Sequence, residues 1–352
     1  MRTDRAAEAF NRFLVDARVW WMRDMYGALR AEYAARAAGQ TVTQPAEVAA
    51  LLADSTLYPF FGWLERHIQK LKYAGRHGLL AAAAAARDEL APQLAAADPA
   101  LLTLDPDLAI PDYYTAIDTH QHPGNLTGDP LAGCVYQASA LSTQPGSTAG
   151  LALHRRFAAR VAEYGRFTRI VDLGCGFGKS TLPLAERLPD AAVEGIDLSA
   201  PCLRLAVTQA AALPQRNLRY RQADAARTGA PAASYDLVTS TMLLHELPPP
   251  AVAAVLAESW RLLAPGGYSV HLDFRTDDPF LRFIHHGHGR RNNEPYMAAF
   301  DRMDVAALHA QLGFEAVQIT PFAEAEGTTA ADYPLWRLPW TLFIARKPLA
   351  AP

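Results

Sequence analysis

The chain has 352 residues, 50% of them hydrophobic and 20% charged, and a formal net charge of -3 at pH 7. This length suggests about two domains and allows a sizeable core. The small negative charge gives no electrostatic reason to expect a nucleic acid or an acidic membrane surface as a partner. Cys134, Cys175 and Cys202 are odd in number and far apart, which argues against a disulfide framework and suits a reducing compartment.

The sequence contains no recognisable targeting or membrane-spanning segment. Its first residues, Met-Arg-Thr-Asp-Arg-Ala-Ala-Glu, lack the apolar core of a signal peptide, and their acidic residues argue against a transit peptide. The longest apolar tract, residues 79–86, is far shorter than the roughly 20 residues that a membrane helix needs. We therefore expect a soluble protein of the cytoplasm.

Residues 1 to about 105 are rich in Ala, Leu, Arg and Glu, which favour helices. Apolar and aromatic residues, Trp20 and Trp21 among them, recur at helical spacing near the N-terminus. Further helices are predicted over 56–72 and 79–96, the second broken or kinked at Pro92. Helix packing is the main interpretation of the aromatic stripe. The alternatives are a substrate cap or a surface for a homodimer.

The amino-acid composition changes over residues 106–150, which are rich in Pro, Gly, Thr, Ser, His and Asp. A plain linker would hold fewer tyrosines, histidines and apolar residues, so this region is interpreted as an ordered loop. It either contributes to a ligand pocket or serves as a structural joint. Five of its side chains are candidate substrate contacts: Tyr113, Tyr114, His120, His122 and Tyr136.

After residue 150 the pattern alternates between strands and helices. A helix is predicted over 151–164, strands over 168–173, 192–198, 218–223, 235–240 and 268–274, and helices between them, as over 200–212 and 251–262. Such alternation predicts an α/β fold with a doubly wound, mostly parallel sheet. The expected organisation is a mostly helical domain over residues 1–150 and an α/β domain over 151–352.

The most informative segment follows the first of these strands and reads Asp172-Leu-Gly-Cys-Gly-Phe-Gly178. Its glycines permit a sharp turn and bring bare backbone against a ligand. The spacing is one residue short of the dinucleotide pattern Gly-x-Gly-x-x-Gly. Asp197 ends the next strand roughly 20 residues later, where a carboxylate can accept hydrogen bonds from ribose hydroxyls, and Asp224 ends the strand after that.

This ordered set resembles the class I S-adenosylmethionine-dependent methyltransferases over residues 151–347. The matching segments are the glycine run, Gly-Ile-Asp197-Leu-Ser, Ala-Asp224-Ala, Tyr-Asp236-Leu-Val with Leu-His245-Glu, and Leu-Leu-Ala-Pro-Gly-Gly267. The ending Thr341-Leu-Phe-Ile-Ala-Arg-Lys resembles the family's last, antiparallel strand, and Gly313-Phe-Glu-Ala-Val-Gln-Ile its hairpin partner. The resemblance implies a Rossmann-like fold that binds S-adenosylmethionine and releases S-adenosylhomocysteine.

The resemblance also implies a role for each cofactor-binding residue. The backbone of Gly174, Gly176 and Gly178 would line the methionine and ribose portion, and Asp172 would order the loop and help to hold the ammonium group. The remaining roles would fall to Asp197 for the ribose hydroxyls, Leu198 and Ala225 beside the adenine, Asp224 for the adenine amino group, and Ser240 or Thr241 near the methionine moiety.

The sequence carries less information about the methyl acceptor than about the methyl donor. The expected reaction is methyl transfer to a small molecule, a metabolite or biosynthetic intermediate, with O-methylation favoured over N- or C-methylation. His245 is the leading candidate for a base or a substrate ligand, because it follows a strand at the cofactor edge and imidazole titrates near neutrality. Arg275, His285 and Arg290 in the insertion after the fifth strand are further substrate candidates.

The sequence predicts no metal site, because His285-His-Gly-His288 lacks partner cysteines and a helical His-x-x-x-His register. Two other functions stay open. A nicotinamide-dependent oxidoreductase would need the longer glycine spacing, and a non-catalytic module would bind the cofactor without transferring a methyl group.

Overall fold

The computed structural model describes residues 5–143, 151–211, 217–325 and 335–349. One eight-stranded sheet of order β1-β4-β3-β2-β5-β6-β8-β7 forms its centre. Strands β1 to β6 pair in parallel, whereas β8 runs antiparallel to both β6 and β7. The strands are β1 Leu102–Thr103, β2 Arg169–Leu173, β3 Ala192–Asp197, β4 Leu218–Gln222, β5 Tyr235–Thr241, β6 Leu263–Phe274, β7 Glu315–Pro321 and β8 Trp340–Arg346.

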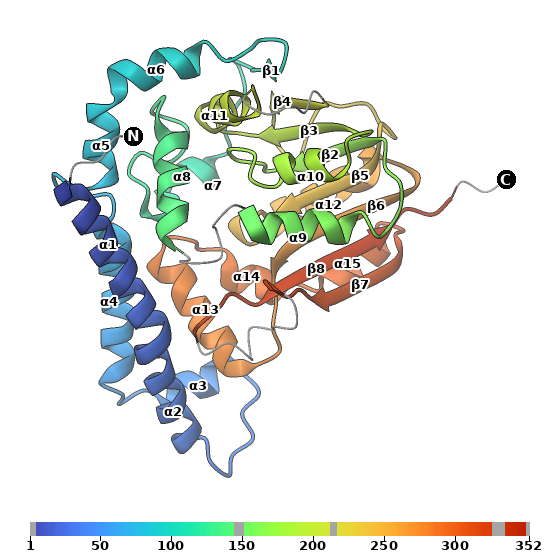
Figure 1. Cartoon of the computed structure of the whole chain (residues 1–352). Coiled ribbons are helices and arrows are strands. Elements are labelled where there is room, and N and C mark those ends of the chain that lie inside the picture. Colours follow the sequence, from blue (N-terminus) through green and yellow to red (C-terminus); the bar gives the residue numbers. More distant parts are fainter. Residues whose placement is uncertain (1–4, 144–150, 212–216, 326–334, 350–352) are drawn as a thin grey trace.

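Helices cover the sheet and extend beyond it as a separate stack on one side (Figure 1). The N-terminal helices are α1 Arg5–Trp20, α2 Tyr26–Arg36, α3 Pro45–Leu51, α4 Leu57–Leu71, α5 Leu79–Ala85, α6 Arg87–Ala95, α7 Asp112–Thr115 and α8 Ala132–Thr143. The later helices are α9 Ala152–Val161, α10 Thr181–Arg187, α11 Ala200–Ala211, α12 Pro249–Leu262, α13 Pro279–Arg291, α14 Met297–Asp301 and α15 Val305–Gln311. The prediction of an α/β fold with a helical N-terminal part is confirmed.

The strands are buried on both faces, as expected for a parallel sheet between helices. Neighbouring residues of β2 show this most simply. Ile170 packs in the cluster that contains residues of α9, α10 and α11, whereas Val171 packs in the cluster that contains residues of α12 and α15. The continuous apolar run of β2 therefore serves two cores at once.

Three boundaries differ from the sequence prediction. Strand β1 was not expected, yet Leu102 pairs with Tyr220 and extends the sheet with a segment from the first 150 residues. Strand β6 begins at Leu263 rather than at residue 268. The helical stretch over 79–96 divides at Ala86, while Pro92 lies inside α6. Pro92 is the sixth residue of α6, and it neither ends nor divides this helix.

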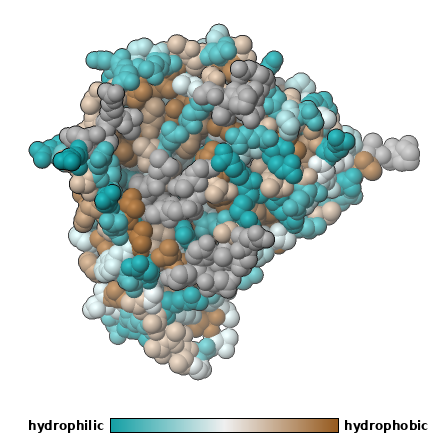
Figure 2. All heavy atoms as spheres, in the orientation of Figure 1, coloured by the Kyte–Doolittle hydropathy of each residue, from teal (hydrophilic) through white to brown (hydrophobic). Residues whose placement is uncertain are grey.

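The N-terminal helices pack onto the rest of the chain through aromatic residues. Trp21 is fully buried, donates a hydrogen bond from Nε1 to the carbonyl of Phe61 at 2.9 Å, and lies edge-on to Trp336 with ring centroids 5.4 Å apart. Trp20, by contrast, is 45% exposed. Figure 2 shows several hydrophobic residues near the junction between these helices and the sheet half of the molecule. The division near residue 150 stays a prediction, because one core cluster contains residues from both parts.

Among the described helices, none combines the length and apolar character needed to cross a membrane. The three cysteines are free thiols, with Cys175 and Cys202 buried.

Candidate functional site

The glycine run after β2 turns the chain sharply at the carboxyl edge of the sheet. Gly174, Gly176 and Gly178 have φ values of +66°, +54° and +84°, which other residues rarely adopt. A Cβ at Gly174 would lie 2.7 Å from a methyl carbon of Leu243, whereas one at Gly176 would meet only the Tyr136 ring, at 3.7 Å. The backbone of Gly174 and Gly176 therefore forms one wall of a pocket.

We call this cavity the glycine pocket. Eight of its lining residues follow β2, β3, β4 and β5 or lie at their ends: Gly174, Gly176, Asp197, Leu198, Ala223, Asp224, Ala225 and Thr241. Tyr113, Tyr114, Leu126 and Tyr136 from the first 150 residues lie opposite. The structure thus brings together most of the predicted cofactor residues and three of the predicted substrate tyrosines.

Asp197 is positioned by the backbone around it. Its Oδ2 accepts the amide N–H of Gly176 and its Oδ1 that of Ser199, each at 2.8 Å. Burial raises the pKa of Asp197, although these amide hydrogen bonds oppose the rise. The carboxylate lies between the glycine turn and the start of α11, and its remaining lone pairs are available to ligand hydroxyl groups.

Three predicted cofactor residues do not line the pocket. Asp172 is fully buried and accepts hydrogen bonds from Ser180 at 2.6 Å and Thr181 at 2.7 Å. Burial raises its pKa to about 6. Asp172 thus ties the end of β2 to the start of α10 and does not line the pocket, and its role toward the ammonium group stays a prediction. A Cβ at Gly178 would lie 2.7 Å from the Tyr220 hydroxyl, so this glycine is required for packing.

Ser240 is the third of these residues. Its hydroxyl lies 2.8 Å from Nδ1 of His271 inside the core. Because successive strand residues face opposite sides of a sheet, only its neighbour Thr241 reaches the pocket.

Four predicted substrate residues also lie outside the pockets. His122 packs edge-on against Tyr73, with ring centroids 5.3 Å apart, and His285 packs edge-on against Phe274, at 5.1 Å. Arg290 points to solvent at the end of α13, and Arg275 is partly buried where β6 leaves the sheet. Their positions follow from helix phase and loop path, which the sequence pattern did not specify.

A second cavity, which we call the histidine pocket, adjoins the first. Its wall contains four histidines, four other aromatic rings, a lysine and several amides: His120, His154, His245, His288, Tyr136, Phe177, Phe274, Trp340, Lys179, Gln69, Gln137 and Asn292. Five side chains line both cavities: His120, Tyr136, Lys179, Met242 and Glu246. The two pockets therefore share one wall.

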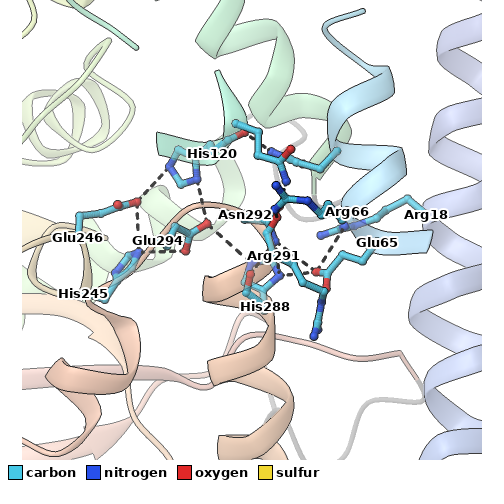
Figure 3. A network of polar contacts seen from close by, with 12 residues as sticks. Arg18, Glu65, Arg66, His120, His245, Glu246, His288, Arg291, Asn292 and Glu294 are labelled. Carbon is cyan, nitrogen blue, oxygen red and sulfur yellow. Dashed lines mark hydrogen bonds and ion pairs between the residues drawn. The ribbon is translucent and has the colours of Figure 1, made fainter. Parts of the chain in front are cut away.

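Two histidines and two carboxylates of the histidine pocket form a cluster, which we call the carboxylate–histidine cluster: His120, His245, Glu246 and Glu294 (Figure 3). His120 and Glu246 also line the glycine pocket. His120 Nε2 lies 3.1 Å from Glu246 Oε1, and His120 Nδ1 lies 3.0 Å from Glu294 Oε1. Burial alone would lower the pKa of His120, but the two carboxylates outweigh it and raise that pKa to about 9.

His245 enters the cluster from the turn after β5. Its Nδ1 lies 2.7 Å from Asp273 Oδ1, and Asp273 also accepts the amide N–H groups of Leu244 and Phe274. These bonds fix the ring, so that Nε2 faces Glu246 Oε1 at 3.5 Å and Glu294 Oε2 at 3.9 Å. Burial opposes charge on His245, but Asp273 holds its pKa well above the usual value.

The backbone at His120 is held in an uncommon conformation. His120 and Gln121 have φ values of 54° and 55°, in the left-handed region, at a cost of about 1–3 kcal/mol each. Gln69 on α4 donates to the His120 carbonyl at 2.7 Å, and the Gln121 side chain donates to the carbonyl of Arg291. Contacts from α4 and α13 therefore hold the imidazole at the shared wall.

A buried ionic group lies beside the cluster, to its right in Figure 3, and joins the N-terminal helices to α13. Glu65 of α4 is fully buried and contacts His288 Nδ1 at 2.5 Å, Arg18 Nη1 at 3.8 Å, and Arg291. Burial would raise the pKa of Glu65, but Arg291, His288 and Arg18 outweigh it and lower the pKa.

The sequence interpretation missed several residues of the site: Glu246, Asp273, Glu294, Lys179 and Glu65. A signal existed for two of them. Glu246 directly follows the candidate His245, and Asp273 interrupts the apolar end of a strand in Val270-His-Leu-Asp-Phe274. Glu294 and Glu65 had no local signal, because tertiary packing alone brings them near His120 and His288.

Comparison with known proteins shows what the segment that contains the glycine run is similar to. Residues 170–267 match the family model described as a methyltransferase domain. A trans-aconitate 2-methyltransferase of Azoarcus sp. (strain BH72) is 38% identical over 151 residues, which are 40% of this chain and 56% of that relative. A trans-aconitate 2-methyltransferase of Methylobacterium radiotolerans is 43% identical over 168 residues, 47% of this chain and 59% of the relative.

Among solved structures, a putative methyltransferase of Bacillus halodurans C-125 aligns with a TM-score of 0.44 and 19% identity, over 55% of this chain and 98% of the other. The chain spans a little over half the length of the two trans-aconitate relatives. Residues 170–267 are therefore similar to a methyltransferase domain, and the glycine run, Asp197 and Asp224 within them lie at the carboxyl edge of the sheet.

Proposed function

We propose that this chain transfers a methyl group from S-adenosylmethionine to a hydroxyl oxygen of a small molecule. The observation that carries the proposal is the wall shared by the two pockets. A cofactor in the glycine pocket and an acceptor in the histidine pocket would face each other across His120, Tyr136 and Glu246.

The glycine pocket offers polar groups and bare backbone suited to S-adenosylmethionine. The bare backbone at Gly176 leaves room for the amino-acid end of the cofactor, and the Asp197 carboxylate stands where ribose hydroxyls would donate hydrogen bonds. Asp224 and Ala225 line the part of the pocket assigned to adenine. S-adenosylmethionine supplies a methyl group made electrophilic by its sulfonium.

The contribution of the protein is chiefly alignment. Methyl transfer needs the acceptor oxygen, the methyl carbon and the sulfur in line, and holding reactants in such geometry removes a large part of a barrier. Phe177, Phe274 and Trp340 offer flat apolar surfaces for the acceptor, and Glu246 and Glu294 offer oxygens toward its hydroxyl.

Oxygen is favoured as the attacking atom because a hydroxyl must lose its proton during the transfer, and the carboxylate–histidine cluster lines the pocket where that hydroxyl would bind. The two relatives named as trans-aconitate 2-methyltransferases support a small-molecule acceptor. Oxygen as the attacking atom is supported by a nocamycin O-methyltransferase of Saccharothrix syringae, which is 40% identical over 100 residues, 28% of this chain and 35% of that relative.

The test is incubation of the purified protein with methyl-labelled S-adenosylmethionine and a metabolite extract of its host, followed by mass analysis of labelled products. We expect a labelled small molecule whose methyl group is bonded to oxygen by NMR. Binding of S-adenosylhomocysteine without any labelled product would favour a non-catalytic module, and binding of NADH alone would favour an oxidoreductase.

A further inference from the structure

The carboxylate–histidine cluster has the composition of a metal site. Within the part of the chain that the structure describes, His120, Glu246 and Glu294 each offer one donor atom, and these atoms lie within 4.8 Å of one another. His245 is not a member of this group of three, but its Nε2 lies 3.5 Å from Glu246 Oε1 and 3.9 Å from Glu294 Oε2, so a small shift would add it as a fourth donor. Imidazole and carboxylate donors together suit a divalent first-row transition metal such as Mn²⁺, Fe²⁺ or Zn²⁺.

The separations between donors agree with this composition. Donors bound at about 2.0–2.1 Å around a tetrahedral ion lie about 3.3 Å from one another. Here Glu246 Oε1 lies 3.1 Å from His120 Nε2 and 3.5 Å from His245 Nε2, and Glu294 Oε2 lies 3.9 Å from His245 Nε2. The two longer distances exceed the usual length of a hydrogen bond, about 2.7–3.2 Å.

The groups behind the donors are those that orient metal-binding histidines. Such histidines generally donate their second ring N–H to a carboxylate, which fixes the tautomer. Nδ1 of His245 lies 2.7 Å from Asp273 Oδ1, a carboxylate outside the proposed donor set. This contact directs Nε2 of His245 toward Glu246 Oε1.

The cluster also lies where a metal would meet the acceptor. His120 and Glu246 line both pockets, and His245 and Glu294 line the histidine pocket. A metal lowers the pKa of an oxygen ligand bound to it. A hydroxyl of the acceptor bound there would release its proton to solvent, and the resulting oxyanion would attack the methyl carbon as the carbon–sulfur bond breaks and its electron pair stays on sulfur.

We propose that His120, His245, Glu246 and Glu294 bind one divalent transition-metal ion, and that this ion receives the hydroxyl of the acceptor. The natural acceptor would then carry an oxygen able to ligate a metal, such as a hydroxyl beside a carbonyl or carboxylate. This inference rests on the proposed methyl transfer for its role, but metal binding itself can be measured independently of activity.

The test uses full-length, tag-free protein treated with chelator, dialysed and titrated with Co²⁺ by visible absorption and with Zn²⁺ by calorimetry. The variant is Glu294→Gln, which removes one ligand charge on the side away from the glycine pocket. Its matched control is His67→Gln, which removes an exposed histidine on α4. Circular dichroism and S-adenosylhomocysteine affinity report on folding and on the cofactor site.

We expect one ion per chain, ligand-field absorption typical of nitrogen and oxygen donors, at least tenfold weaker binding for Glu294→Gln, and unchanged binding for His67→Gln. The inference is overturned if wild-type protein that binds S-adenosylhomocysteine takes up no ion, or if Glu294→Gln binds ions as wild type does. If wild-type protein does not bind S-adenosylhomocysteine, that result would instead count against the proposed function.

Discussion

His120 Nδ1 lies 3.0 Å from Glu294 Oε1, although the two residues are 174 positions apart in the chain. One belongs to the loop before α8 and the other follows α13, so the contact joins the N-terminal region to the insertion after β6. The same imidazole reaches Glu246 beside β5. The wall between the two pockets is thus assembled from three separate parts of the sequence.

Glu65→Gln should destabilise the protein strongly. The substitution removes the buried carboxylate that faces Arg18, His288 and Arg291, and breaking a buried ion pair by removing one partner costs about 3–5 kcal/mol. Urea denaturation followed by circular dichroism measures the loss. Glu89→Gln, at an exposed position of α6, is the control and should change stability little. Equal stability of the two variants would show that Glu65 does not hold the N-terminal helices to α13.

Gly178→Ala should cost more stability than Gly39→Ala. Both glycines have positive φ, +84° and +76°, but a Cβ at Gly39 meets nothing within 4 Å, whereas one at Gly178 lies 2.7 Å from the Tyr220 hydroxyl. Gly39→Ala therefore measures backbone strain alone, about 1–2 kcal/mol, and Gly178→Ala adds a collision. Thermal unfolding of both variants compares them. Similar melting temperatures would contradict the role of Gly178 in packing.

Lys179→Met should stabilise the protein near neutral pH. Burial lowers the pKa of Lys179 from 10.5 to about 8. Below pH 8 the ammonium is charged in both the folded and unfolded states, and the penalty of burying it is fully present. Between pH 8 and 10.5 the folded protein releases the proton first, so that penalty falls as pH rises.

The expected gain for Lys179→Met is about 1–3 kcal/mol at pH 7. It should shrink steadily toward pH 10. Urea denaturation of variant and wild type at pH 7, 8.5 and 9.5 gives the difference in unfolding free energy at each pH. A difference that stays constant or grows with pH would contradict the assigned burial of this ammonium.

The strands and the cofactor edge were predictable because their signals are local. The glycine run requires positive φ at Gly174 and Gly176, and Asp197 and Asp224 follow apolar strands whose carboxyl ends must meet at one edge. Segment β1 was not predicted, because Leu102–Thr103 is too short to show a strand pattern.

The residues that line the histidine pocket were only partly predictable from the sequence. His120, Tyr136 and His245 were singled out as candidates by their positions, and the structure places all three in the walls of the pockets. His122 was singled out on the same grounds, but its ring packs against Tyr73 instead. Which of two nearby loop histidines faces a cavity depends on backbone angles such as the positive φ at His120, and the sequence pattern does not encode these.

The most direct test of the account is calorimetric titration of S-adenosylhomocysteine into wild-type protein, Asp197→Ala and the control Asp190→Ala, which changes an exposed aspartate after α10. The Asp197 carboxylate should accept charge-assisted hydrogen bonds from the ribose hydroxyls, which are worth about 1.5–3 kcal/mol. We predict that Asp197→Ala binds roughly 10–100-fold more weakly, while Asp190→Ala binds as wild type does and both variants stay folded. Equal affinity of Asp197→Ala and wild type would contradict the assignment of the glycine pocket to the methyl donor.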